Sequence, residues 1–575
     1  MLSYVVILSL CTLWVAIFIV LLRQDRPMWL MLLLLLVPVI IASADINLQV
    51  ISAHGFMHAS IVYELDQRGV PPENPLLAGE PLHYPYGHHY LISQLIHVLP
   101  VAPGRWFVFT NLLCLLLFSL VLERIARLFS PDRTYRILAV FISLVGCNPF
   151  ANGPLREPFL MLSLPNENRT ILLGKFLSIN SNSLGLLCFA VAFLGLLRLI
   201  TNVKGSVLSY LLIASGFVGA AFLYPVVWPG ILVCIGLAAL YLWYLRIPGA
   251  FQTGGYLMVI LIAGVAVVMP WFWSIGDGKA ASAMPQIISF RGLLRNALVI
   301  VTSMTLPIGL AWFMRKTLME KFRAHLPMMQ YCLLCLVALQ VMFWLIFIPI
   351  HSEYKYLAMS EIPLALILAL LLQKLLERRW VTAMVVLFFV SLPVNWVIWR
   401  NVVSGYGPVS DPVVCEGNLI IHQEPNQQAL YQWIRQETKP NAVFIDTYLT
   451  VPPFAQRQLF VGLDARRDSG QLHGRDGWSM TAKMFLELVN GSDPQVLERR
   501  RYLAKQLLLK DNSKIYSKLI HQLIAEVPGR NLYIIAREPE VKQKLSHTPG
   551  IQQTYSNSSA TVFQVLGSNA IVHHL

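Results

Sequence analysis

The stretch MWLMLLLLLVPVIIASAD, residues 28–45, is apolar apart from Ser43 and a final carboxylate, Asp45. About 20 apolar residues in a helix cross the hydrocarbon core of a bilayer, so a run of this length is typical of a membrane-spanning helix. An ionised carboxylate inside the hydrocarbon is costly. The stretch therefore predicts a spanning helix that ends at Asp45, with this carboxylate at the edge of the membrane.

Similar apolar segments recur along the first 400 residues of the chain. Of the 575 residues, 56% are hydrophobic and only 13% are charged, which is typical of a membrane protein. From apolar length we predict about twelve spanning helices. They lie near 3–22, 28–44, 106–122, 136–150, 178–198, 206–223, 226–245, 254–273, 297–314, 328–350, 356–373 and 381–398.

Alternate short loops between these segments hold 16 basic residues against 5 acidic ones. Basic residues accumulate in cytoplasmic loops, so these loops are predicted on the cytoplasmic side and both chain termini on the outer side. The net charge of +14 is then partly an orientation signal, and we do not expect nucleic acid as a partner. The localisation predicted is a bacterial inner membrane.

The polar residues gather on the predicted outer side. The segment 400–575 has the composition of a soluble domain, with a helix expected at 427–440 and strands at 441–449, 531–539 and 559–566. The predicted fold class is a polytopic α-helical membrane protein with a C-terminal extracytoplasmic α/β domain. Its two domains are a transmembrane part, 1–399, which includes the first outer loop at 45–105, and the α/β part, 400–575.

The first outer loop is rich in histidine and tyrosine. His54 and His58 are four residues apart, so a helix would place them on one face. His83, Tyr84 and His88 follow a turn-rich stretch that would fold back over this helix. Asp45 and these loop residues also have simpler interpretations. A carboxylate at the membrane edge can be a solvated cap, and histidine and tyrosine can be interfacial anchors.

A metal site at the histidine pair is an open alternative. His54 and His58 with a carboxylate could ligate a divalent cation, but the remainder of an HExxH motif is missing. The sequence therefore predicts no particular cofactor, and a divalent metal stays an open alternative.

A carboxylate directly after an early spanning helix, opening a long first outer loop with surface helices, resembles the GT-C superfamily. The run GVPPENPLLAGEPLHYPYGHHY, residues 69–90, is similar to first loops of bacterial members. The resemblance implies an inverting glycosyltransferase that uses a polyprenyl- or dolichyl-phosphate sugar donor and works on a glycan, lipid or protein acceptor. It implies further that Asp45 is the catalytic base, with His54 or His58 orienting or assisting it.

A departing lipid phosphate needs cations, which the predicted outer loops supply. The candidates for substrate or phosphate binding are Arg156, Lys175, Arg291, Arg295, Lys355, Tyr356, His83, Tyr84 and His88. Arginine has the better geometry for a phosphate, but Lys355 stands at the start of a spanning helix, at headgroup depth. A lysine and a tyrosine at this depth are equally typical of simple membrane anchors.

Two other functions remain open from the sequence. A transporter or flippase would place ionisable residues at the bilayer midplane, whereas the apolar segments here are nearly free of charge, with Glu361 as the clearest exception. A non-catalytic relative could use its outer domain to bind a partner or polysaccharide, because a fold does not fix a function. The one-sided distribution of polar residues favours an enzyme.

Overall fold

A computed structural model describes most of the chain. The described residues are 53–146, 172–176, 181–203, 206–276, 286–347, 354–388, 391, 425–463, 492–509 and 516–566. Asp45, Arg156 and the predicted spans 3–22 and 28–44 lie outside them. The chain divides into two units, of which the first is Met1–Gln49, Phe107–Phe272 and Met284–Gly407, and the second is Val50–Trp106, Trp273–Ala283 and Pro408–Leu575.

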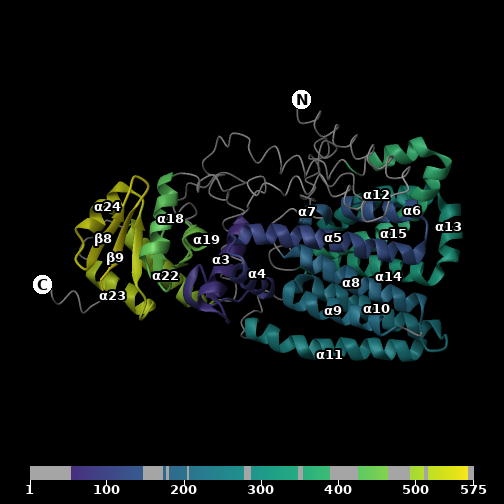
Figure 1. Ribbon diagram of the computed structural model, residues 1–575, viewed down its shortest axis with the longest axis horizontal. Coiled ribbons are helices and arrows are strands. Elements are labelled where there is room, and N and C mark those ends of the chain that lie inside the picture. The colour runs from purple at the N-terminus through teal and green to yellow at the C-terminus, as the bar shows by residue number, and fades with distance from the viewer. Residues whose placement is uncertain are drawn as a thin grey trace. The chain divides into compact units, whose positions relative to one another are not determined.

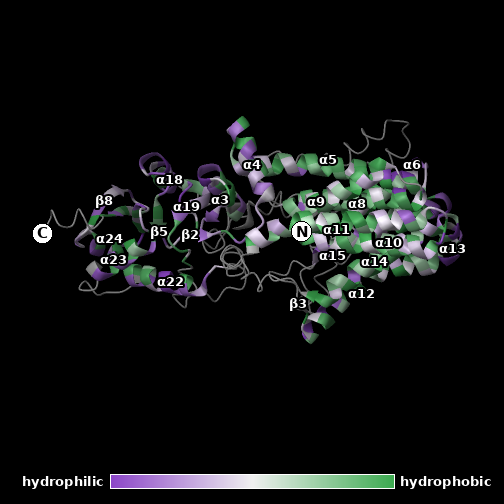
Figure 2. Ribbon diagram, turned by 90° about the horizontal axis from the view of Figure 1, so that it is seen from below, coloured by the Kyte–Doolittle hydropathy of each residue, from purple (hydrophilic) through white to green (hydrophobic). Residues whose placement is uncertain are grey.

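The first unit consists of long apolar helices (Figures 1 and 2). In chain order its elements are α5 (Pro103–Phe129), α6 (Arg133–Val145), α7 (Leu172–Phe176), α8 (Asn182–Thr201), α9 (Val207–Leu223), η2 (Pro225–Val227), α10 (Trp228–Leu245), α11 (Ala250–Gly276), β3 (Gln286–Ile287), α12 (Phe290–Phe313), α13 (Arg315–Ala324), α14 (Leu326–Leu345), β4 (Ile346–Phe347) and α15 (Tyr354–Arg378). The short strands β3 and β4 pair antiparallel.

Seven described helices are long and apolar enough to cross a membrane, which makes the chain an integral membrane protein. They are Pro103–Phe129, Asn182–Thr201, Pro225–Leu245, Ala250–Ile275, Phe290–Phe313, Leu326–Leu345 and Tyr354–Arg378. Each coincides with a predicted span, but the predicted total of twelve is not confirmed. Helices α6, with 13 residues, and α9, with 17, are shorter than the usual span.

The shortness of α6 has a local cause. Asp132 caps its first turn by accepting a hydrogen bond of 3.0 Å from the Tyr135 backbone N–H. Gly146 ends the helix with a φ of 86°, a conformation that glycine adopts without strain. Thirteen residues rise about 20 Å, which is less than the hydrocarbon thickness.

The helices differ in how deeply they are buried. In α15, 94% of the apolar window is buried, whereas in α11 the figure is 17%. Helix α15 is therefore the core of the first unit, and α11 presents most of its apolar surface outwards, as a lipid-facing helix does. Helices α8 and α9 approach most closely where Gly216 lies against the backbone of Cys188 and Ala192.

The second unit begins with a segment of the first loop. Helix α3 (Ala53–Arg68) confirms the predicted helix that carries His54 and His58, and α4 (Gly87–Val98) carries His88. Between them, β1 (Glu73–Asn74) and β2 (Leu77–Pro81) form an antiparallel hairpin in a stretch predicted only as turns.

A five-stranded sheet forms the centre of the second unit. Its strands are β5 (Val443–Ile445), β6 (Gln458–Leu459), β7 (Leu532–Ala536), β8 (Ile551–Ser556) and β9 (Thr561–Val565), in the order β6-β5-β7-β9-β8. Strands β6, β5 and β7 are parallel, and β9 and β8 are joined antiparallel. The remaining elements are α18 (Pro425–Glu437), α19 (Val451–Ala455), α22 (Pro494–Leu509), α23 (Tyr516–Glu526) and α24 (Pro539–Ser546).

The hairpin of the first loop covers the β6 edge of this sheet. Leu459 donates a backbone hydrogen bond of 2.9 Å to Pro75, and Gly462 donates one of 2.8 Å to Leu76. Leu77 and Ala78 join the hydrophobic core formed by the sheet with α22 and α23. The loop segment 50–106 thus belongs to one unit with the C-terminal segment, whereas the domain boundary at residues 399 and 400 was predicted to separate them.

Candidate functional site

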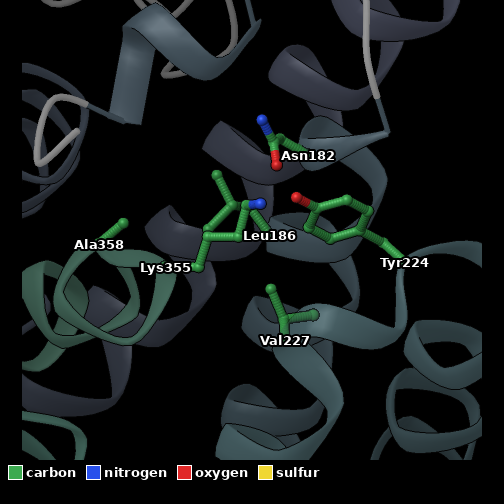
Figure 3. Close-up of a pocket in the computed structure, with 6 residues that line it drawn as sticks. All are labelled: Asn182, Leu186, Tyr224, Val227, Lys355 and Ala358. Atoms are coloured by element: carbon green, nitrogen blue, oxygen red, sulfur yellow. The ribbon is translucent and has the colours of Figure 1, made fainter. Parts of the chain in front are cut away.

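Lys355 lines a small pocket in the helical unit. It is the second residue of α15, and its Nζ lies 4.9 Å from the ring centroid of Tyr224 and 5.1 Å from that of Tyr354. The pocket is lined by Asn182, Leu186, Tyr224, Val227, Lys355 and Ala358. Figure 3 shows the Lys355 ammonium, the Tyr224 hydroxyl and the Asn182 amide turned towards the same space.

Two local features of the sequence place the Tyr224 ring in this pocket. Pro225 cannot continue α9, so the helix ends at Leu223 and the chain turns at Tyr224. Gly185 of α8 leaves room for the ring, because a Cβ at this position would lie 2.5 Å from Tyr224 Cδ1. Any larger residue at 185 would displace the tyrosine from the pocket.

The pocket has the properties of an anion site. An ammonium group is attracted to aromatic faces, and in a weakly polar surrounding a positive charge attracts an anion more strongly than in water. Asn182 is the first residue of the 20-residue helix α8, whose N-terminal backbone dipole also favours negative charge. In Figure 3 the Asn182 side chain turns its oxygen towards the Lys355 ammonium and the Tyr224 hydroxyl, so the positive charge of Lys355 is the main attraction that the pocket offers to an anion.

The other predicted phosphate ligands of the helical unit lie elsewhere. Tyr356 is fully buried in α15. Arg291 is exposed in the first turn of α12, and Arg295 donates hydrogen bonds of 3.2 and 3.1 Å from Nε and Nη2 to Oδ1 of Asn296. Lys175 lies in α7, but its side chain is outside the described residues. Lys355 is thus the cation that the structure places at the described pocket.

The second unit gathers the histidines of the first loop. His58 Nδ1 and His89 Nε2 are 2.7 Å apart, so one ring donates a hydrogen bond to the other. His58, His88 and His89 are all buried. The Tyr84 ring lies edge-on to the pair, with centroids 6.3 Å from His58 and 5.8 Å from His89.

Burial keeps His88 and His89 of this cluster neutral. It lowers the pKa of His88 to about 3, and it lowers the pKa of His89 well below the ordinary value, with help from His88. A neutral ring offers no positive charge to a phosphate, and so low a pKa makes it a weak proton acceptor near neutral pH. These two rings therefore suit structural support better than anion binding or proton transfer.

His83 is held apart from this cluster. Its Nδ1 lies 2.7 Å from the carbonyl oxygen of Ile275, so Nδ1 carries the proton and donates. The side chain of His54 lies outside the described residues. Over the described ranges, no three His, Cys, Asp or Glu side chains are placed to hold a metal ion.

A polar network lies on the other side of α3. Glu64 accepts hydrogen bonds of 2.6 Å from Arg68 and 2.8 Å from Gln458. Burial raises the pKa of Glu64 to about 8, although Arg68 opposes the shift. Burial also acts on Glu73, but hydrogen bonds from Arg530 and Gln458 outweigh it and lower the pKa of Glu73 to about 2.

No known family profile and no curated protein sequence matches the chain. Solved structures do match. ArnT from Cupriavidus metallidurans in the apo state gives a TM-score of 0.51 at 11% identity, covering 93% of this chain and 98% of that chain. ArnT bound to undecaprenyl phosphate gives 0.52, with the same identity and coverage.

The chain has the ArnT fold. At 11% identity the match shows a shared fold, in line with the predicted polytopic helical architecture. The ArnT match spans nearly the whole chain, including both units described above.

Within this ArnT fold, Asn182 and Tyr224 are the polar residues of the pocket that were not predicted from the sequence. A polar Asn-Ser run directly before an apolar helix marks Asn182, and a tyrosine before a proline at the end of an apolar helix marks Tyr224. Both signals are weak alone, because interfacial anchors share them.

Proposed function

We propose that this chain is a membrane glycosyltransferase that takes a sugar from a polyprenyl-phosphate donor. The observation that carries the proposal is the ArnT fold. The chain matches ArnT both in the apo state and in complex with undecaprenyl phosphate. The Lys355 pocket supports the proposal, because it offers a positive charge and a helix N-terminus to an anion. Its position at the start of the buried helix α15 suits the phosphate of a lipid.

The sequence supplies the proposed roles of the remaining groups. Asp45 is the proposed base, and His54 or His58 orients or assists it. Further candidates for binding the donor or acceptor are Arg156, Lys175, Arg291, Arg295, Tyr356, His83, Tyr84 and His88. The acceptor is a hydroxyl of a glycan, lipid or protein.

The proposed reaction is a single displacement. The acceptor hydroxyl gives its proton to Asp45 while its oxygen attacks the anomeric carbon of the sugar. The bond from that carbon to the phosphate oxygen breaks, and the electron pair leaves with the polyprenyl phosphate. Lys355 stabilises the charge that develops on this leaving group. Attack from the opposite face inverts the anomeric configuration.

The proposed location is a bacterial inner membrane with both chain termini outside. In this orientation the first loop and the segment 400–575 lie on the extracytoplasmic face, where the transfer takes place. The proposal treats residues 1–399 as a transmembrane domain and residues 400–575 as an α/β domain with which the loop segment 50–106 packs. One of the two matched ArnT structures holds undecaprenyl phosphate, which is a lipid phosphate.

Binding of undecaprenyl phosphate tests the proposed role of the pocket. The protein in lipid nanodiscs is titrated with this lipid, and bound copies are counted by native mass spectrometry. Lys355→Met should weaken binding by about ten- to a hundredfold, since a hydrogen bond to a charged group contributes about 1.5–3 kcal/mol.

The control is Lys374→Met, at the other end of the same helix, where Lys374 pairs with Glu377. It should bind as the unaltered chain does. Equal affinity in the two variants, or no binding by the unaltered chain, would remove the pocket from the proposal.

A further inference from the structure

Two side chains of the protein itself occupy the place in the five-stranded sheet where ligands bind in sheets of this kind. In doubly wound sheets, ligands bind at the carboxyl ends of the strands where the strand order reverses, which here lies between β5 and β7. Asp446 and Arg537 follow these two strands and form two hydrogen bonds, of 2.8 and 2.7 Å. The Arg537 guanidinium also stacks 3.8 Å from the ring centroid of Tyr448. A ligand of this unit must therefore use another surface.

An aromatic pair lies at the β8 edge of the sheet, between α18 and β8. The Trp433 and Tyr555 rings stack with centroids 4.9 Å apart and an interplanar angle of 24°. Both side chains are partly exposed. Asn557 donates hydrogen bonds of 3.0 Å to the Tyr555 hydroxyl and 2.7 Å to the backbone oxygen of Asn426, which ties the β8–β9 turn to the start of α18.

Amide side chains surround this pair. Gln552 of β8 lies directly opposite Gln564 of β9, so the two share one face of the sheet. Tyr555 lies opposite Val562, which shares that face with Gln564 because the two are two residues apart on one strand. Gln552 is exposed and Gln564 partly exposed. We call the group Trp433, Gln552, Tyr555 and Gln564 the amide–aromatic surface.

The amide–aromatic surface is free of charge in a strongly basic chain. The segments 425–434 and 551–565 contain no charged residue, although the chain as a whole carries +14. Arg435, the next residue of α18, lies near Tyr63 and Arg457, on whose pKa values it acts. These two segments therefore offer no charged side chain to a phosphate, a nucleic acid or an acidic peptide.

We propose that the amide–aromatic surface binds a neutral oligosaccharide. A sugar ring has an apolar face of C–H groups, which packs on an aromatic ring, and hydroxyl groups at its edge. An amide side chain both donates and accepts hydrogen bonds, as a hydroxyl does, so the two match without any charge. This inference goes beyond the proposed transfer and does not depend on it.

The full chain in nanodiscs tests the proposal with three soluble probes: maltohexaose, cellohexaose and chitohexaose. Binding is measured by isothermal titration with no lipid donor present, so the result is independent of any transfer. Trp433→Ala and Gln552→Ala should each weaken binding of the hexaose that binds best, by about tenfold for the tryptophan. Gln552 is exposed, so its replacement does not disturb folding.

The control is Tyr502→Ala, which removes a ring that is 61% exposed on α22 and leaves the sheet edge intact. It should not change the affinity. The proposal is overturned if the unaltered chain binds none of the three hexaoses, or if both variants bind as it does. It is also overturned if the chain dimerises and Gln552→Pro abolishes the dimer, because the β8 edge then pairs with a second copy.

Discussion

Arg530 donates a hydrogen bond of 2.7 Å from Nη2 to Oε1 of Glu73, although 457 positions separate the two residues. Arg530 also donates one of 2.6 Å to Gln458, whose amide reaches both Glu73 and Glu64. This network joins the first loop to the C-terminal sheet. The sheet therefore supports the helices that carry the histidine cluster.

Removing this link should destabilise the second unit. Arg530→Met leaves the Glu73 carboxylate without its strongest partner, which we expect to cost about 2 kcal/mol of unfolding free energy. Thermal unfolding in detergent should show a lower Tm. Arg501→Met is the control, because Arg501 pairs with the 71% exposed Glu498 and such surface pairs contribute little. Equal Tm values for the two variants would contradict the role of the network.

Because of Glu64, the free energy of unfolding should fall as the pH rises from 4.5 to about 8. Its pKa of about 8 in the fold exceeds the ordinary 4.5, so between these values the folded state holds a proton that the unfolded state has lost. The contribution of this group is complete below pH 4.5 and is lost as pH rises through 8. The expected slope is about 1.4 kcal/mol per pH unit.

Unfolding of the unaltered chain and of Glu64→Gln at pH 6 and pH 8 measures this contribution. The unaltered chain should lose more stability over this interval than the variant, which has no group to titrate. Glu498→Gln, on an exposed carboxylate, should behave as the unaltered chain does. If the Glu64→Gln variant shows the same pH dependence as the unaltered chain, burial does not shift this carboxyl.

His88 should lower the free energy of unfolding as the pH falls, which is the opposite of the effect of Glu64. Burial lowers the pKa of His88 to about 3, so the unfolded state binds a proton first as pH falls below 6.5. Stability from this group is present above 6.5 and is lost as pH falls through 3. Between pH 7 and pH 5 the loss should be about 2 kcal/mol.

His88→Gln should reduce this acid sensitivity, as measured by Tm at pH 7 and pH 5. His521→Gln, at an exposed histidine of α23, should leave it unchanged. An unaltered response in His88→Gln would mean that the ring titrates normally in the fold.

The contact between α8 and α9 should not tolerate a methyl group at Gly216. A Cβ there would lie 2.4 Å from the carbonyl oxygen of Cys188, which is backbone and cannot rotate away. Gly216→Ala should cost about 1–3 kcal/mol, as overpacking does. Gly236→Ala of α10 meets nothing within 4 Å and should be neutral or stabilising. Comparable yields of folded protein from the two variants would contradict the close approach of the helices.

The spanning helices were predictable because apolar length is a local property. Helix α15 begins at Tyr354, so Lys355 lies at the helix start as predicted. The span predicted at 136–150 is α6 at Arg133–Val145, because the cap Asp132 and the glycine Gly146 decide where this helix begins and ends. The apolar composition of a segment does not show where such capping residues end the helix.

The site was predictable only in part, because its residues meet through tertiary contacts. His58 and His89 are 31 positions apart, and no periodicity links them. The Tyr224 ring, which follows α9, lies against the ammonium of Lys355, which is in the first turn of α15. The β1–β2 hairpin lacks the alternation of apolar and polar residues by which strands are identified. It is held instead by backbone hydrogen bonds to β6.

The proposed glycosyl transfer is tested most directly by release of the lipid product. Proteoliposomes receive a panel of undecaprenyl-phosphate-linked sugars with a cell-envelope extract as acceptor, and free undecaprenyl phosphate is measured by mass spectrometry. We predict release from at least one donor by the unaltered chain and by Lys374→Met, and loss of release in Asp45→Asn and Lys355→Met. Absence of release from every donor, or equal release by all four proteins, would contradict the account.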